Sequence, residues 1–391
     1  MKIALFTDTY PPFINGVSTS TANLRMTLID HGHDVLVIAP RTDDGEFEFK
    51  DGIIWLPGLE LKKMYGYRFT TVYSSKAMKI LEEFKPDIIH YQTDFTIGQF
   101  AKIAAKKLKV PTVYTYHTSY EDYTYYVTHG FLDRAAKKTI RAYSKSVATS
   151  VTEFITPSKK TKDFMRNSGV DIYINVIPTG IDFSLFDESR IDQEKMKQFK
   201  LEHGIKENTK VFLILGRVAK EKSMDVSIKG FARYVKLYPE EDVKLIIVGN
   251  GPQKNELELL VHELRISHLV DFIGSVPASE VPFYYHLADI YTSASLTETQ
   301  GLTFMEAMAS KCVVVARYDD NLSGTIIDGQ TGYFFTDEDS FARRCHYILT
   351  MPKEDKDKII NNALDVVDAY SIEKFYQNII GVYRRAIRKH W

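Results

Sequence analysis

A strand, a loop and a helix follow one another in the stretch Ile290-Tyr-Thr-Ser-Ala-Ser-Leu-Thr-Glu-Thr-Gln-Gly-Leu-Thr-Phe-Met-Glu-Ala-Met-Ala309. The apolar run around Ile290 is typical of a strand, and the loop turns through Gly301 into a helix. Glu298 in the loop and Glu306 in the helix stand eight residues apart. Carboxylates accept hydrogen bonds from sugar hydroxyls, and backbone N–H groups at the start of a helix bind phosphate. This junction therefore has both kinds of group that a nucleotide sugar requires.

The same carboxylates also fit a purely local role. Ser295-x-x-Glu298 and Thr303-x-x-Glu306 both match a helix capping box, which needs no ligand. On this stretch alone, both interpretations stay open.

Length, charge and cysteine content restrict the class of protein. A chain of 391 residues is too long for one ordinary core and suits two domains of about 150 to 200 residues each. The net charge of -1 gives no global field that would attract nucleic acid. Cys312 and Cys345 are too few for a disulfide framework or a zinc site, which fits a reducing cytoplasm. The apolar run near the N-terminus is far too short for a signal peptide, and we expect no segment to cross a bilayer.

Short apolar runs alternate with helical stretches, such as Thr19 to Asp30, through the first half of the chain. This is the rhythm of βαβ units in a parallel sheet, and near-continuous apolar runs indicate a sheet that helices cover on both faces. The predicted strands are Lys2 to Phe6, Val35 to Ala39, Ile53 to Leu56, Asp87 to His90, Thr112 to Tyr116 and Phe154 to Thr156.

The rhythm restarts after the charged stretch that ends near Lys210, which predicts a second α/β domain. We expect an N-terminal domain over residues 1–184, a C-terminal domain over 185–371 and a final helix over 372–391. Cations at the end of that helix suit its dipole. The strands predicted for the second domain are Val211 to Gly216, Val243 to Val248, Phe272 to Gly274, Ile290 to Ser293 and Val313 to Ala316.

Gly16 lies between the first strand and the first helix, in Asp8-Thr-Tyr-Pro-Pro-Phe-Ile-Asn-Gly16. A glycine there can bring bare backbone close to a phosphate at the helix start. A simple turn glycine is an equally good explanation. The chain contains neither a G-x-G-x-x-G fingerprint after this strand nor a P-loop.

Arg217 and Lys222 follow the first strand of the second domain, in Gly216-Arg-Val-Ala-Lys-Glu-Lys222. The carboxyl ends of strands in open α/β sheets border the ligand crevice, so these two cations could clamp a diphosphate. A solvated loop explains them equally well. Gly249 and Gly251 follow the next strand and permit close approach of a ligand, which is weak evidence alone.

His117 and His90 each lie at the end of a predicted strand. A lone histidine is more often structural than catalytic, but this position favours function. We find no spacing typical of a catalytic metal and no G-x-S-x-G motif, so the sequence supports neither a metal site nor a nucleophilic triad.

Taken in order, Gly16, Arg217, Lys222, Glu298 and Glu306 resemble the retaining glycosyltransferases of family 4 over almost the whole chain. Glu298-x7-Glu306 is similar to the E-x7-E signature of that family, and Gly-Arg-x4-Lys to its phosphate clamp. Val176-Ile-Pro-Thr-Gly-Ile-Asp182 is similar to its interdomain strand. The resemblance implies a GT-B fold of two facing Rossmann-like domains, with the donor in the cleft and a C-terminal helix that crosses back to the N-terminal domain.

The segments that begin at His117 and Glu298 resemble most the bacterial diacylglycerol α-glycosyltransferases, which build glycolipid anchors. This narrower resemblance implies transfer of glucose from UDP-glucose to diacylglycerol, with retention of the anomeric configuration and without cofactor or metal. By resemblance, Glu306 takes the ribose hydroxyls and Glu298 those of the donor sugar, while His117 contacts the transferred sugar. The residues expected to hold the donor phosphates are Gly16, Arg217, Lys222, Gly301, Leu302 and Thr303.

One departure from the family pattern follows the helix that carries Glu306. Relatives usually read Gly-x-Pro-Val-Val there, whereas this chain reads Lys311-Cys-Val-Val-Val. Because glycine is the usual residue at a helix C-terminus, we expect a different local turn.

Three other functions remain open. The protein could transfer galactose or a second sugar to a monoglycosyl-diacylglycerol. It could also be a sugar-nucleotide 2-epimerase on the same scaffold, because a scaffold does not determine chemistry. The third is a non-catalytic partner that only binds a nucleotide sugar.

A stripe of cations predicts that the N-terminal domain docks on an anionic membrane, at the inner face of the cell membrane, to reach a lipid acceptor. The cations recur at three- and four-residue steps, so they lie on one face of a helix. A solvated helix face is the ordinary alternative. We expect aromatic residues such as Phe69 to sit at the interface with Arg68 beside it. The stripe comprises Arg134, Lys137, Lys138, Arg141 and Lys145.

Overall fold

The computed structural model describes residues 1–13, 15–60, 68–117, 142–296, 298, 300–319, 322 and 324–390. The chain forms two compact units. Unit 1 comprises Met1–Ile181 together with Ile372–Trp391, and unit 2 comprises Asp182–Ser371. The C-terminal helix α14 (Ile372–His390) is therefore part of the unit that contains the N-terminus.

Unit 1 is built on an eight-stranded sheet with the order β10-β9-β8-β7-β1-β2-β4-β3. Neighbouring strands are parallel except β3, which pairs antiparallel with β4 at the edge. A separate antiparallel pair, β5 and β6, completes the strands of this unit in the described ranges. The strands are β1 (Lys2–Phe6), β2 (Asp34–Pro40), β3 (Glu48–Lys50), β4 (Ile53–Leu56), β5 (Gly58–Glu60), β6 (Arg68–Thr70), β7 (Ile88–Tyr91), β8 (Thr112–Thr115), β9 (Glu153–Thr156) and β10 (Ile174–Val176).

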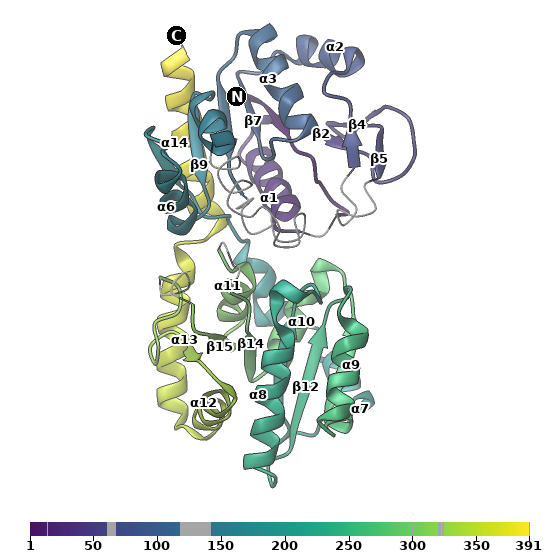
Figure 1. The fold of residues 1–391 in the computed structure, drawn as a ribbon, viewed down its shortest axis with the longest axis vertical. Helices are drawn as coiled ribbons and strands as arrows, with labels where there is room; N and C mark the ends of the chain where they lie inside the picture. The colour runs from purple at the N-terminus through teal and green to yellow at the C-terminus, as the bar shows by residue number, and fades with distance from the viewer. Residues whose placement is uncertain are drawn as a thin grey trace. The chain divides into compact units, whose positions relative to one another are not determined.

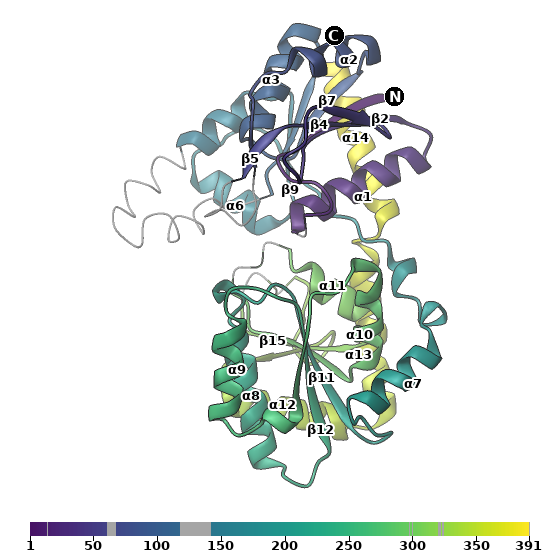
Figure 2. The same ribbon diagram turned by 90° about the vertical axis from the view of Figure 1, so that its right-hand side faces the viewer.

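Helices cover both faces of the sheet in unit 1 (Figures 1 and 2). On one face α1 and α14 bury Leu24, Leu28 and Ile379 against strand residues such as Leu5. On the other face α2 and α3 bury side chains that include Leu81 against the same strands. This two-sided burial explains why the strands are almost continuously apolar. The helices are α1 (Gly16–Asp30), α2 (Ser75–Phe84), α3 (Thr96–Leu108), α6 (Lys159–Asn167) and α14, and residues 142–149 are also helical.

Unit 2 contains a six-stranded, fully parallel sheet with the order β13-β12-β11-β14-β15-β16. Its strands are β11 (Lys210–Leu215), β12 (Val243–Val248), β13 (Val270–Gly274), β14 (Ile290–Ser293), β15 (Val313–Arg317) and β16 (Tyr333–Phe335). Its α-helices are α7 (Gln193–Glu202), α8 (Met224–Leu237), α9 (Lys254–Glu263), α10 (Val281–Leu287), α11 (Leu302–Ala309), α12 (Glu338–Thr350) and α13 (Lys353–Asp368). Its 3-10 turns are η1 (Phe183–Phe186), η2 (Glu188–Arg190), η3 (Lys220–Lys222), η4 (Ser267–Leu269) and η5 (Ala278–Glu280).

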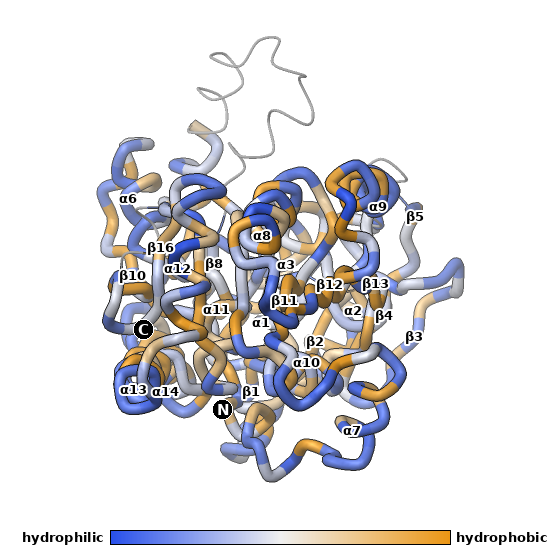
Figure 3. Tube along the Cα trace, turned by 90° about the horizontal axis from the view of Figure 1, so that it is seen from below, coloured by the Kyte–Doolittle hydropathy of each residue, from blue (hydrophilic) through white to orange (hydrophobic). Residues whose placement is uncertain are grey.

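Hydrophobic and hydrophilic residues alternate around the surface helices α8 and α9 of unit 2 (Figure 3). Their apolar sides, which include Ile228, Phe231 and Leu257, pack on the sheet residues Phe212 and Leu245. A helix with one apolar stripe buries that stripe on a sheet and leaves its polar side to water.

Both sheets have a topological switch point. In unit 1, β1 lies between β2 and β7, so the chain moves outward in opposite directions from β1. In unit 2, β11 lies between β12 and β14 in the same way. Six strands of each unit follow the Rossmann order 3-2-1-4-5-6, and in such sheets ligands bind beyond the carboxyl ends of the strands at the switch point. The two Rossmann-like domains that the sequence predicted are confirmed.

The expected difference in the turn after α11 is wrong. Lys311 holds a φ of 60°, the left-handed conformation in which a glycine commonly ends a helix. The N–H of Cys312 donates to the carbonyl of Ala307 at 2.9 Å, and the N–H of Lys311 donates to that of Met308 at 3.0 Å. These two hydrogen bonds form a Schellman motif, so the lysine keeps the turn that glycine would make.

Candidate active site

Lys222 and Glu298 meet at the switch point of unit 2. Lys222 ends the turn η3 that follows β11, and Glu298 lies in the loop that follows β14, the neighbouring strand. The Lys222 Nζ and the Glu298 Oε1 are 2.6 Å apart, and the side chains are 29% and 13% exposed. The fold thus joins a cation and a carboxylate that the sequence had assigned to the diphosphate and to the donor sugar.

Arg217 lies one residue beyond Gly216 at the end of β11, and its guanidinium pairs with the carboxylate of Glu221. Both cations predicted for the diphosphate therefore have acidic partners in this structure. A phosphate oxygen could replace either carboxylate, because guanidinium and ammonium groups bind both kinds of anion.

Gly249 and Gly251 have a packing role that the sequence did not reveal. A Cβ atom on Gly249 would lie 1.8 Å from the carbonyl oxygen of Gly216, and one on Gly251 would lie 2.3 Å from that of Val218. Gly249 also has a φ of 137°, which other residues rarely adopt. The loops that follow β11 and β12 lie directly against each other, and the two glycines make this contact possible.

The helix that carries Glu306 begins without a side-chain cap. Gly301 is the N-cap residue of α11 with a φ of 72°, and no side chain caps the helix. Thr303 lies inside the helix, so neither Ser295 nor Thr303 is the N-cap of a capping box. Leu302 and Thr303 form the first turn, whose backbone N–H groups have no acceptor within the helix itself. The local capping interpretation is therefore wrong.

Glu306 projects from α11 toward Tyr285 of α10, whose hydroxyl donates to its carboxylate at 3.0 Å. Burial raises the pKa of Glu306 to about 7. The Tyr285 hydroxyl is also 3.1 Å from the carbonyl oxygen of Thr303. Tyr285 was absent from the sequence-based site because nothing near it in the chain distinguishes it from the other aromatic residues of α10.

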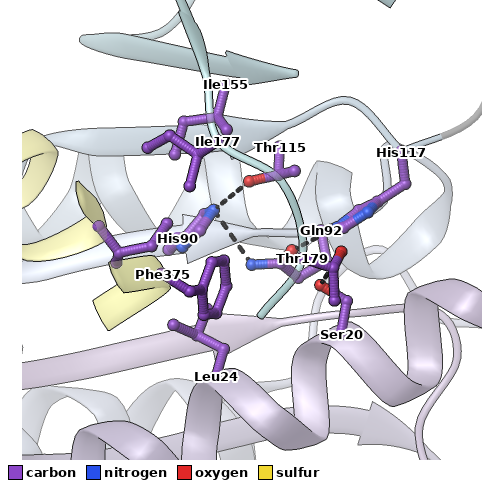
Figure 4. A pocket seen from close by; sticks show the side chains of 11 residues that line it. Ser20, Leu24, His90, Gln92, Thr115, His117, Ile155, Ile177, Thr179 and Phe375 are labelled. Carbon is purple, nitrogen blue, oxygen red and sulfur yellow. Dashed lines mark hydrogen bonds between the residues drawn. The ribbon is translucent and has the colours of Figure 1, made fainter. Parts of the chain in front are cut away.

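His117 belongs to unit 1, where it follows β8. Its Nε2 lies 2.7 Å from the Oε1 of Gln92, which follows β7 (Figure 4). Burial lowers the pKa of His117 to about 4, so the ring is neutral at physiological pH. Gln92 in turn contacts His90, and both side chains are buried. His90 is therefore a core residue of unit 1, as the structural alternative expected.

Gly16 is the first residue of α1, and the side chain of Asn15 caps this helix by accepting from the N–H of Ser18 at 2.9 Å. A Cβ atom on Gly16 would meet nothing within 4 Å, and its φ lies outside the left-handed region. Neither the backbone conformation nor the packing of the described residues requires glycine here. Close approach of a ligand remains a sufficient reason for it.

Four of the five predicted stripe cations, Arg134, Lys137, Lys138 and Arg141, lie outside the described residues. Lys145 is exposed on the helical segment 142–149. Arg68, which was expected beside Phe69 at the interface, is buried, because only 5% of its side chain is exposed. Its guanidinium donates to the carbonyl of Gly58 and pairs with Asp44.

The pair β5 and β6 nevertheless presents apolar side chains to solvent. Leu59 and Phe69 face each other across the two strands and are 78% and 59% exposed.

Among the described residues there is no group of three or more His, Cys, Asp and Glu side chains that could hold a metal ion. None of the helices within the described ranges is long and apolar enough to cross a membrane.

Two Rossmann-like units, each with a switch point, define the GT-B class of glycosyltransferases. Sequence profiles agree: "Glycosyl transferases group 1" matches residues 195–366, and "Glycosyltransferase Family 4" matches residues 14–185. The chain is 34% identical to an alpha-monoglucosyldiacylglycerol synthase of Acholeplasma laidlawii over 90% of its own length and 89% of the relative. It is 36% identical to an enzyme of the same name from Streptococcus pneumoniae, over 88% of this chain and 77% of that one.

The structure of Anabaena Alr3699/HepE in complex with UDP-glucose has a similar fold. Its TM-score is 0.73 at 18% identity, with coverage of 97% of this chain and 98% of that one. The chain belongs to family 4 of the glycosyltransferases. The members of this family are retaining hexosyltransferases that typically work without a metal ion.

Proposed function

We propose that this glycosyltransferase moves glucose from UDP-glucose to a 1,2-diacylglycerol and forms an α-glucosyl glycolipid. The observation that carries the proposal is the similarity, at 34% and 36% identity over about nine-tenths of the chain, to two alpha-monoglucosyldiacylglycerol synthases. The exposed side chains of Leu59 and Phe69 in unit 1 also support a lipid acceptor, because they provide apolar surface that a lipid can contact.

In this proposal unit 2 holds the donor. Glu306 accepts the ribose hydroxyls and Glu298 accepts hydroxyls of the glucose. Arg217, Lys222 and the backbone N–H groups from Gly301 to Thr303 bind the diphosphate. The partial burial of Lys222 and Glu298 supports these roles, because charged hydrogen bonds are stronger where water is scarce.

The cations would also promote the reaction. As the glycosidic bond to UDP breaks, negative charge builds up on the leaving phosphate oxygens. Arg217 and Lys222 would then bind the transition state more tightly than the ground state. No described carboxylate is assigned as a covalent nucleophile, so the acceptor hydroxyl attacks from the face that UDP leaves, and a phosphate oxygen of UDP takes its proton.

Unit 1 would contribute Gly16 and His117. Backbone at Gly16 would lie against the donor phosphate, and His117 would contact a hydroxyl of the transferred sugar. The neutral ring of His117 supports this second role, because an uncharged imidazole both donates and accepts a hydrogen bond.

We also propose that unit 1 docks on the anionic inner face of the cell membrane through Arg134, Lys137, Lys138, Arg141 and Lys145. A cluster of cations on a helix binds anionic lipids electrostatically. Docking would give the enzyme access to an acceptor that does not leave the bilayer.

The test is product analysis with the purified protein, mixed micelles and a panel of sugar nucleotides. We expect α-glucosyl-diacylglycerol from UDP-glucose, identified by mass spectrometry and by the anomeric proton coupling. The variant Glu298→Gln, which replaces one carboxylate oxygen by an amide NH2 group, should form little product and shows that the activity belongs to this chain. Transfer of galactose instead of glucose would show that the proposed donor is wrong. Transfer only to a monoglycosyl-diacylglycerol would show that the proposed acceptor is wrong. Turnover of the donor without an acceptor would indicate an epimerase, and binding without turnover a partner protein.

A further inference from the structure

Tyr383 of the C-terminal helix α14 reaches the centre of the sheet in unit 1. Its hydroxyl lies 2.7 Å from the Nδ1 of His90, a residue of β7 that is 293 positions away in the sequence. Neither side chain is exposed to solvent. The two rings stand edge to face, with centroids 5.6 Å apart.

A continuous line of hydrogen bonds runs from Tyr383 to the candidate site. The Nε2 of His90 lies 3.0 Å from the amide nitrogen of Gln92 and 2.8 Å from the hydroxyl of Thr115. The amide oxygen of Gln92 lies 2.7 Å from the Nε2 of His117. Figure 4 shows His90, Gln92 and His117 in line, beside a cavity of about 10 Å³, which is close to the space of one water molecule.

The chemistry of the amide group gives this line a direction. The Gln92 nitrogen can only donate, so the Nε2 of His90 accepts and its Nδ1 carries the proton that is donated to Tyr383. The Gln92 oxygen can only accept, so the Nε2 of His117 carries a proton. A neutral His117 then has its single lone pair on Nδ1.

We propose that Tyr383, His90 and Gln92 are positioning residues that hold His117 in the Nε2–H tautomer, so that its Nδ1 accepts a hydrogen bond from a hydroxyl of the transferred sugar. This inference rests on the role of His117 in the proposed function. It assigns to the C-terminal helix a part in catalysis beyond its packing on the sheet.

The proposal also restricts the ligand class at His117. Burial lowers the pKa of both imidazoles, to about 4 for His117 and about 3 for His90, so neither ring carries a charge near neutral pH. A neutral ring with its lone pair on Nδ1 attracts a hydroxyl donor and gains no ion pair from a phosphate or carboxylate. A sugar hydroxyl fits this requirement.

The first experiment compares Tyr383→Phe with a matched control on the same helix. The hydroxyl of Tyr376 also forms a hydrogen bond with a histidine, since it lies 3.0 Å from the Nε2 of His33. Neither Tyr376 nor His33 belongs to the line toward His117. In full-length protein labelled with ¹⁵N-histidine, the two-bond ¹⁵N–¹H spectrum identifies the tautomer of each ring. We expect Tyr383→Phe to mix the tautomers of His117 and to lower kcat about tenfold. Tyr376→Phe should change neither.

Donor binding separates positioning from general damage. The affinity for UDP, which lacks the transferred sugar, should stay the same in Tyr383→Phe, because the diphosphate and ribose are assigned to unit 2. A His117 spectrum and a kcat equal to those of Tyr376→Phe would overturn the proposal. If Tyr383→Phe fails to fold, Gln92→Met interrupts the same line from a loop, and an unchanged His117 tautomer in that variant would equally reject it.

His117→Ala distinguishes this inference from the proposed function. Wild-type glycolipid synthesis by His117→Ala would remove His117 from the proposed mechanism, and with it the catalytic part of the inference. Strong loss of activity in His117→Ala together with an unaffected Tyr383→Phe would keep the mechanism and reject only the line of positioning residues.

Discussion

At the scale of single residues, the ion pair between Lys222 and Glu298 joins the two strands that flank the switch point of unit 2. The residues are 76 positions apart in the sequence and 2.6 Å apart in the structure. Because both side chains are mostly buried, salt screens their attraction less than that of a surface pair. The pair holds the Glu298 carboxylate beside one of the two cations proposed for the diphosphate.

Arg217→Ala should weaken the binding of UDP without unfolding the protein. The change removes one charged hydrogen-bond partner and no core volume, which corresponds to about 1.5 to 3 kcal/mol, or roughly ten- to a hundredfold in affinity. Calorimetric titration with UDP measures it. Arg233→Ala is the control, since Arg233 pairs with Asp339 elsewhere in unit 2. Equal affinity in both variants would mean that Arg217 is not part of the donor site.

Glu306 should make the binding of UDP depend on pH. Burial raises its pKa to about 7, and only the carboxylate accepts from both ribose hydroxyls, so affinity should decrease as the pH falls below 7. Glu306→Gln should bind more weakly than wild type at pH 8 and lose this part of the pH dependence. Calorimetric titrations of both proteins with UDP between pH 5.5 and 8 measure this difference. Protonation of UDP itself affects wild type and Glu306→Gln equally, so only the effect of Glu306 differs between them.

The carboxyl group of Glu306 should also make the free energy of unfolding depend on pH. Its pKa in the folded protein is above the ordinary value of 4.5, so the folded state gains stability from protonated Glu306 at low pH. That contribution is present below pH 4.5 and is lost as the pH rises through 7. Urea unfolding of Glu306→Gln should lack this component, and an identical pH dependence in the two proteins would contradict the raised pKa.

At the scale of elements, the turn after α11 places a lysine in a conformation that suits glycine. A left-handed conformation costs a residue other than glycine about 1 to 2 kcal/mol, while glycine loses more entropy on folding. The Lys311 side chain is 58% exposed, and its Nζ is 3.9 Å from Glu188, which is a weak contact. We therefore expect Lys311→Gly to raise the free energy of unfolding by about 1 kcal/mol.

Urea unfolding also tests this prediction. Lys311→Ala is the control, because alanine removes the same contact with Glu188 and keeps the strained backbone. A gain in Lys311→Ala as large as in Lys311→Gly would show that the side chain, and not the φ angle, destabilises the turn.

The loops of unit 2 show a second element-scale constraint. Backbone at Gly249 approaches backbone at Gly216 so closely that no Cβ atom fits between them. The N–H of Gly249 also donates to the carbonyl of Gly274 at 2.8 Å, and that of Gly216 to the carbonyl of Val248 at 3.0 Å. Hydrogen bonds thus join the start of the loops after β11 and β12 to the end of β13, and this backbone supports Arg217 in the position where it would hold an anion.

At the scale of the whole molecule, the proposed donor site predicts that transfer does not depend on a divalent metal. Arg217 and Lys222 supply the positive charge that the departing diphosphate requires. We expect the rate of glycolipid formation to be the same with excess chelator as without it. Loss of turnover in chelator and its return with magnesium or manganese would reject the assignment of the diphosphate to these two cations.

Membrane docking is a second property of the whole molecule. We expect the protein to sediment with anionic vesicles and not with zwitterionic ones, and to be released by salt. Each cation near an anionic surface contributes about 1 kcal/mol, so changing Lys137, Lys138 and Arg141 together to Ser should release most of the protein.

A matched triple variant controls for the loss of three charges. Lys197, Lys353 and Lys358 are exposed residues of unit 2, and their change to Ser should leave sedimentation unaltered. If the two triple variants bind vesicles equally, the stripe in unit 1 is ordinary solvated surface.

The sequence by itself determined the class of the fold and the chemical types in the candidate site. Apolar runs of strand length and helical periodicity are local properties, so all six predicted strands of unit 1 and all five of unit 2 lie where the structure has them, within two residues at each end. The short strands β3, β5, β6, β10 and β16 were not predicted from the apolar runs, because three residues carry too little periodicity. Arg217, Lys222 and Glu298 could be chosen because each follows a recognisable strand, and Glu306 because it lies in the helix that follows the loop of Glu298.

Only the tertiary structure decided which of these residues meet. The order of strands places β11 beside β14 and so pairs Lys222 with Glu298, and it brings Tyr383 of α14 against His90 in β7. Local sequence patterns contain no information about such neighbours, since these contacts join residues 76 and 293 positions apart. For the same reason the sequence did not reveal Tyr285 as a site residue, because its partner Glu306 lies on another helix. Nor did it reveal the shifted pKa values of Glu306 and His117, which depend on burial that the whole fold creates.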